Sequence, residues 1–262
     1  MFNRESHRLP VFFSVFKGII MNKDRFAKFW ELAHKTVVVG DDASAVTGYK
    51  GTAVAGDKGV AVAGDNGIAK AGIDGMAEVG KVGVATVSTD GRATAGDYGA
   101  AVAGYHGMVR VGDEGVAKAG DHGTAVVGYK GVAMAGDYGA KATADSYGIA
   151  KTGDEGTATT GYKGVSVAGD YGRAVTGKYG MAMAGMYGCA SAGDNGIATV
   201  GVYGCASAGI NGVIQIWYYD GLEMKIEVGR IGDEGLEPNT LYEVALAPKR
   251  FVRSLEYRSD NC

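Results

Sequence analysis

The chain has 262 residues, of which 46 are Gly and only 3 are Pro. Gly is present at about two and a half times its ordinary usage, but it does not recur at every third position, which excludes collagen. The 46% hydrophobic content and the net charge of −3 exclude simple disorder. No nucleic-acid partner is expected, because residues 40–216 carry 13 Lys/Arg against 17 Asp/Glu.

The N-terminal residues contain a short apolar run, Leu9–Ile20, preceded by two Arg residues. Lys17 interrupts this run and no small-x-small cleavage site follows it, so a signal peptide is the less favoured interpretation. The run is also too short to span a bilayer. Met21 can equally be the natural start, which would make residues 1–20 an upstream extension. We therefore expect no membrane span and a cytoplasmic location, with an exported or virion-associated protein as the alternative.

The segment Asn22–Lys35 has the pattern of an amphipathic helix within an N-terminal extension of residues 1–37. Asn22 and Asp24 suit a helix N-terminus. The residues on the apolar face are Phe26, Phe29, Trp30 and Ala33. We expect this helix to plug the first coil of the region that follows, and a membrane-surface or partner helix is the alternative.

An eight-residue repeat runs from Gly40 to Ile216, with the consensus Gly-Asp/Tyr-x-Gly-x-Ala-x-small, and gives 22 units. The first Gly is present in 20 units and the second in 21. The register slips once by one residue, in the unit Ala144–Thr152, so we expect a single inserted residue near Ser146. A fixed short period of this kind is typical of solenoid architectures.

Each unit divides into a four-residue turn and a four-residue strand. In the strand, small residues alternate with residues that tolerate charge, which is the pattern of a half-buried strand. In the turn, we expect Gly to supply positive φ and Asp, present in half of the units, to hydrogen-bond the backbone two residues on. The small inward residues include Ala45, Ala53, Ala61 and Ala69, and the outward residues include Lys70, Glu78, Arg110 and Lys118.

Strands of this length bury nothing alone, so the units must stack into coils. The segment Tyr187–Gly193 recurs sixteen residues later as Tyr203–Gly209, which favours two units per coil. Similar turns at Gly96 and Gly136 are 40 residues apart, which is not a multiple of sixteen and counts against two units per coil. Two units per coil give about eleven coils and a rod about 50 Å long, at ~4.8 Å per strand. The handedness of the coil is left open.

After Ile216 the composition changes, and strand and turn patterns predict a small β cap over residues 217–262. The expected strands are Met224–Arg230, Leu241–Leu246 and Arg250–Leu255, with a further segment beginning at Trp217. A cap is expected because open strand edges promote association. The domain organisation is thus an extension, a solenoid over residues 38–216, and this cap.

The repeat and the tail together resemble the Gly/Ala-rich octapeptide-repeat proteins of bacteria and phages. The likeness covers residues 40–244. It rests on the repeat consensus and on the closing segment Val228-Gly229-x-Ile231-Gly232-Asp233-Glu234-Gly235-Leu236-x-Pro238-Asn239-Thr240-Leu241-Tyr242. More distantly, the repeat is similar to the sixteen-residue solenoid of ice-nucleation proteins. The resemblance implies an all-β β-solenoid and no particular reaction.

Tyrosine is the most suggestive residue for binding, because eleven of the fifteen Tyr lie in the repeat turns. In sixteen-residue coils, Tyr171, Tyr187 and Tyr203 would stack along one edge. The predicted binding edge comprises Tyr138, Tyr171, Tyr187, Tyr203, His106 and His122. Such a ladder suits a polysaccharide or a protein partner. The alternative is that stacking only stabilises the edge.

Other chemistries have weaker support in the sequence. Two His residues without a third ligand are more typical of solvated turns than of a metal site, and turn-capping explains the Asp residues better than calcium binding does. Cys189 and Cys205 occupy equivalent outward positions and would form a ladder disulfide after export, or stay thiols in the cytoplasm. Ice binding would need a flat outward array of Thr-x-Thr. Thr157-Ala158-Thr159 is the one strand with Thr in both outward positions, which argues against ice binding.

No Ser/His/Asp or Cys/His constellation and no phosphate-binding loop is recognisable, so we expect no enzyme, no cofactor and no metal. The favoured function is a non-enzymatic scaffold or protein-interaction module. The alternatives are a phage- or surface-associated recognition protein that uses the Tyr edge, an enzyme with its site in Trp217–Tyr242, and, least favoured, an ice-nucleation-like activity. Solenoids can also form homo-oligomers along an edge or end to end.

Overall fold

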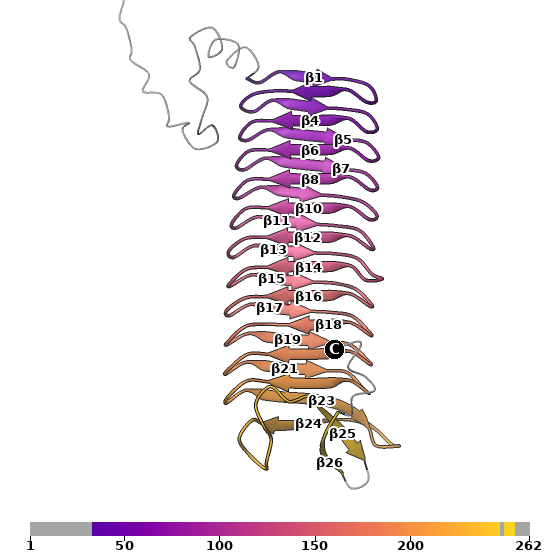
Figure 1. Cartoon of the computed structure of the whole chain (residues 1–262), viewed down its shortest axis with the longest axis vertical. Coiled ribbons are helices and arrows are strands. Elements are labelled where there is room, and N and C mark those ends of the chain that lie inside the picture. The colour runs from indigo at the N-terminus through magenta and orange to yellow at the C-terminus, as the bar shows by residue number, and fades with distance from the viewer. Residues whose placement is uncertain (1–32, 247–248, 255–262) are drawn as a thin grey trace, which may run out of the picture.

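The computed structural model describes residues 33–246 and 249–254, and these residues form strands and no helix. The chain winds into a long β-solenoid of about eleven coils, closed at the C-terminal end by antiparallel strands (Figure 1). This confirms the predicted fold class. The helix expected from Asn22 falls outside the described residues as far as Leu32, and Ala33 and His34 form a turn. Within the described ranges, no helix could cross a membrane.

Every coil contributes one strand to each of two sheets, and neighbouring coils pair in parallel. Sheet A contains β1 (Thr36–Val38), β3 (Thr52–Val54), β5 (Ile68–Ala71), β7 (Val84–Val87), β9 (Ala100–Val102), β11 (Val116–Lys118), β13 (Val132–Met134), β15 (Ile149–Lys151), β17 (Val165–Val167), β19 (Met181–Ala184), β21 (Ile197–Val200), β23 (Val213–Tyr219) and β24 (Met224–Arg230). Sheet B contains β2 (Ser44–Val46), β4 (Val60–Ala63), β6 (Met76–Val79), β8 (Arg92–Ala95), β10 (Met108–Val111), β12 (Thr124–Val127), β14 (Lys141–Ala144), β16 (Thr157–Thr160), β18 (Arg173–Val175), β20 (Cys189–Ala192), β22 (Cys205–Ala208), β25 (Tyr242–Leu246) and β26 (Lys249–Arg253). Register partners lie sixteen residues apart, as Cys189 and Cys205 do, so two units make one coil.

The single change of register lies earlier than predicted. Thr124 of β12 pairs with Lys141 of β14, seventeen residues on, whereas β14 and β16 pair at sixteen. The extra residue is Gly139, which has a φ of 76° and where an added Cβ would have no described atom within 4 Å. The prediction of an insertion near Ser146 is wrong because Gly139 fits the repeat consensus. The Gly positions therefore stay in phase up to Gly139, although Lys141 already falls where the repeat has an inward Ala.

The core is a thin layer made mainly of Ala. Inward positions alternate with outward ones along each strand, so that Ala61, Ala69 and Ala77 have no exposed surface. Each Ala methyl contributes only about 0.8 kcal/mol on burial. Stability must therefore accumulate coil by coil through backbone hydrogen bonds and repeated neighbour contacts.

The C-terminal cap replaces this Ala layer with larger side chains. β23 pairs antiparallel with β24, and β25 pairs antiparallel with β22 and with β26. The buried side chains at this end include Ile214, Ile216, Ile231, Leu236 and Tyr242. The predicted small β cap is therefore present, and it covers the end of the last coil with apolar residues.

Candidate functional site

The turns that join the sheets form two long edges, one on each side of the rod. The first edge consists of the eleven turns that lead from sheet A to sheet B, such as Gly104–Gly107. The second edge consists of the eleven turns that lead from sheet B to sheet A, such as Gly112–Gly115. In the consensus form Gly-x-x-Gly, the two middle residues are the variable ones and carry the chemistry of the edge.

The third residue of each repeat turn has a left-handed backbone, with φ between 53° and 62°. His106, Tyr171 and Lys163 all adopt it, so the prediction that Gly supplies the positive φ is wrong for the repeat. This conformation is costly for most non-Gly residues. A hydrogen bond to the next coil accompanies it, because the N–H of His106 donates to the carbonyl of Asp121 at 2.9 Å.

The repeat glycines are required for space. A Cβ added to Gly120 would lie 2.8 Å from the carbonyl carbon of Gly104 in the preceding coil. A Cβ added to Gly123 would lie 2.8 Å from the Cβ of Ala119. The first Gly therefore allows two turns to stack closely, and the second allows the chain to pass its own inward side chain.

Asp at the second turn position bonds to the next coil. Oδ1 of Asp154 accepts the N–H of Asp170 at 2.8 Å, and Oδ1 of Asp170 accepts the N–H of Met186 at 2.7 Å. Ten turns of the described region follow this pattern. The predicted bond two residues on is wrong for these turns, because stacking brings the equivalent N–H within about one strand spacing, ~4.8 Å.

All six predicted binding residues occupy the third position of first-edge turns. The ring centroids of Tyr171 and Tyr187 lie 5.0 Å apart with planes 7° from parallel, and those of Tyr187 and Tyr203 lie 5.0 Å apart with planes 19° from parallel. Tyr171 is 54% exposed and Tyr203 is 55% exposed. These three residues, here called the Tyr ladder, form one continuous stack in solvent.

The other predicted residues form a second group on the same edge. The rings of His106 and His122 lie 4.8 Å apart, and His122 stacks on Tyr138 at 5.9 Å. Tyr105 adds a stacked contact to His106 at 4.2 Å. Glu155 occupies the turn position between Tyr138 and the Tyr ladder, so the predicted edge is two groups.

The second edge has an aromatic row that the sequence analysis missed. Tyr129, Tyr147, Tyr162 and Tyr179 follow one another with ring centroids 5.5 to 5.7 Å apart and edge-to-face orientations. The ammonium of Lys163 lies 5.3 Å from the ring centre of Tyr162. These residues alternate between the second and third turn positions. Their sequence separations are therefore not sixteen, and only the coil assignment reveals the row.

The histidine pair does not extend into a metal cluster. Nδ1 of His106 lies 3.6 Å from Oδ1 of Asp90. In the part of the chain that the structure describes, no three His, Cys, Asp or Glu side chains are arranged to hold a metal ion.

The two repeat cysteines are register partners but are not bonded to each other. Cys205 is a free thiol, so the ladder disulfide is not formed. Both side chains are buried, although their positions were predicted to face outward. Cys205 is buried because the C-terminal segment covers it, with the hydroxyl of Ser254 at 3.5 Å from its sulfur.

The outward Thr residues of β16 do not belong to a regular array. Thr157 pairs in register with Lys141 on one side and Arg173 on the other. Long charged side chains therefore flank it, whereas ice binding would require a flat row of Thr.

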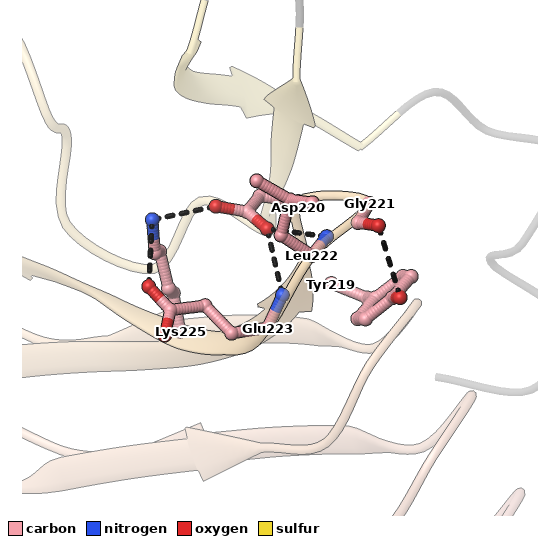
Figure 2. A network of polar contacts seen from close by, with 6 residues as sticks. All are labelled: Tyr219, Asp220, Gly221, Leu222, Glu223 and Lys225. Atoms are coloured by element: carbon pink, nitrogen blue, oxygen red, sulfur yellow. Dashed lines mark hydrogen bonds and ion pairs between the residues drawn. The ribbon is translucent and has the colours of Figure 1, made fainter.

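The turn between β23 and β24 has a compact polar network (Figure 2). Asp220 accepts the backbone N–H groups of Leu222 and Glu223 at 2.9 and 3.0 Å, and Lys225 pairs with both acidic side chains. The Lys225 ammonium and these N–H groups hold the pKa of Asp220 well below its ordinary value. A carboxylate that stays ionised in this way stabilises a turn and is not tuned for proton transfer near neutral pH.

Comparison with models of known protein families, with curated proteins and with solved structures finds no match to this chain. The resemblance to octapeptide-repeat proteins therefore stays a prediction, and the function must be argued from the geometry of the edges and faces.

Proposed function

We propose that this protein is a non-enzymatic scaffold or protein-interaction module that displays rows of side chains at a fixed spacing. The observation that carries the proposal is the Tyr ladder, in which one turn position of three successive coils presents rings 5.0 Å apart. Backbone hydrogen bonds within both sheets and between turns fix this spacing. A rigid repeated surface provides many equal contacts along an extended partner.

The arrangement of the histidines supports a display role over catalysis. An enzyme site brings unlike groups together around one reacting atom. The first edge instead places ring beside ring, with His106 and His122 between Tyr105 and Tyr138. A reproducible turnover of simple ester, phosphate or glycoside substrates that disappears on His106→Ala/His122→Ala would overturn the non-enzymatic assignment.

The Tyr ladder favours a second candidate, recognition of a polysaccharide or host protein by a phage- or surface-associated protein. Parallel stacking at 5.0 Å leaves no room for a ligand between rings. The accessible parts are therefore ring edges and hydroxyl groups, which suit hydrogen bonds to an extended polymer. The hydroxyls recur at the coil spacing, so a partner with a similar repeat would gain multivalent contacts.

A panel of purified polysaccharides and cell-surface proteins tests this recognition. For a partner found in the panel, Tyr171→Phe/Tyr187→Phe/Tyr203→Phe should weaken binding at least tenfold, because it removes the hydroxyls and keeps the stack. The matched control, Tyr129→Phe/Tyr147→Phe/Tyr162→Phe, alters the second edge and should leave binding unchanged. Equal losses in both variants, or no loss in the first, would refute recognition by the Tyr ladder.

A further inference from the structure

The two sheets present different residues to solvent. In sheet A, the first outward position is apolar in ten consecutive strands that pair in register. These residues are Ile68, Val84, Ala100, Val116, Val132, Ile149, Val165, Met181, Ile197 and Val213. In sheet B, the same position includes Arg92, Lys141 and Arg173. Sheet B therefore has an ordinary solvated face, and sheet A does not.

The apolar column of sheet A is open to solvent along the rod. Ile68, Val84, Val116 and Ile149 are 38% to 44% exposed. The face continues onto the cap, where Trp217 is 40% exposed. On an ordinary protein surface, exposed apolar residues are scattered singly. A contiguous apolar surface of this extent instead marks an interaction site.

We propose that the outer face of sheet A is the interface of a homodimer, in which a second copy of this chain lies against the first along its length. Twelve solenoid strands form this face. At ~4.8 Å per strand and ~3.3 Å per residue the face measures about 55 by 13 Å. Two such faces bury roughly 1,400 Å², which is the size of a stable protein–protein interface.

A second copy also matches this face in shape, and it places no Lys directly opposite another Lys. An identical rod has the same length, flatness and coil spacing, so the surface is complementary to itself around a two-fold axis. With the rods antiparallel and fully overlapped, β1 lies opposite β23 of the partner. This pairing puts Lys70 opposite Met183, Lys118 opposite Met134 and Lys151 opposite Val102. These three cations therefore meet apolar partners and no second Lys, and each can bury its aliphatic stem. This interface goes beyond the proposed scaffold role, because it uses a sheet face and leaves both edges free.

Sedimentation equilibrium of the full chain at micromolar concentration tests the proposal. The wild type should have twice the monomer mass of 26.9 kDa. Val116→Lys/Val132→Lys places charges at the centre of the face and should weaken dimerisation at least a hundredfold. Thr124→Lys/Thr157→Lys places the same charges on sheet B and should leave the dimer intact. Far-UV circular dichroism verifies the fold of each variant. If the Lys variant fails to fold, Val116→Thr/Val132→Thr replaces it, and this milder variant should also weaken the dimer.

Several results would overturn the proposal. A monomeric wild type at 100 μM, as an order-of-magnitude ceiling for a specific interface, would refute it. A dimer that persists in the sheet A variants, or one that is lost in the sheet B control, would assign the contact to another surface. A monomer that floats with anionic phospholipid vesicles would identify the face as a membrane contact instead.

Discussion

Replacing Gly120 by Ala separates the two explanations of the repeat glycines, conformational freedom and space. The added Cβ would lie 2.8 to 2.9 Å from the carbonyl carbon and oxygen of Gly104 and the nitrogen of Tyr105. Ordinary contacts between such atoms are about 3.5 Å or longer. Relief would require the coils to separate by about 0.7 Å. That would stretch the hydrogen bond from Gly120 N to Gly104 O, now 3.2 Å, beyond its useful range.

The expected cost follows from two opposing terms. Overpacking against atoms that cannot move costs about 1–3 kcal/mol. The loss of Gly freedom in the unfolded chain returns about 0.4–1 kcal/mol. The free energy of unfolding of Gly120→Ala should therefore fall by about 1–2 kcal/mol, seen as a lower urea midpoint by far-UV circular dichroism.

Gly40 provides the matched control, since it is the same repeat position in the first coil. Among the described residues, a Cβ there would meet nothing within 4 Å. Gly40→Ala should leave stability unchanged or raise it by up to about 1 kcal/mol. Equal destabilisation by the two substitutions would show that backbone freedom, and not close stacking, selects Gly at this position, and would refute the reasoning.

Three further changes test the polar groups. Thr176→Val should raise the free energy of unfolding by about 1 kcal/mol, because its buried hydroxyl has no partner among the described residues; a lower urea midpoint would contradict this. Asp170→Ala should speed hydrogen exchange of the Met186 amide, whose acceptor it removes, and cost up to about 1 kcal/mol, whereas Asp170→Asn should retain the bond. Lys225→Met should raise the pKa of Asp220 toward about 3.9, measured by carbon NMR of the carboxyl group. Since the folded pKa of Asp220 is lowered, the contribution of this carboxylate to stability is present above the unfolded pKa and disappears as the pH falls through the folded value. An unchanged titration of Asp220 in Lys225→Met would contradict the ion pair.

The coil of two units and the stacking of Tyr residues along one edge could be predicted because both follow from a regular period. Tyr187 and Tyr203 are sixteen residues apart, and a parallel stack places such residues one above the other. The inward Ala positions were predictable for the same reason, since alternation along a strand fixes the face of each side chain.

The errors came from features that the repeat pattern hides. Gly139 has the residue type that the consensus demands and so hides the insertion, although Lys141, which would then fall on an inward Ala position, is a signal for it in the sequence. Turn chemistry was assigned within one unit, whereas Asp154 bonds to the following coil. The aromatic row of the second edge and the apolar face of sheet A require each unit to be assigned to a sheet. Averaging all units into one consensus removes that difference.

The alternation of units between the sheets limits how the length of this protein can change. Duplication of one eight-residue unit would transfer every later strand to the opposite sheet and exchange the two edges. The Tyr ladder would then continue from the other side of the rod, and the apolar column would be interrupted. Only duplications or deletions of sixteen residues preserve the pattern, so homologous rods should differ in length by steps of one whole coil, ~4.8 Å each.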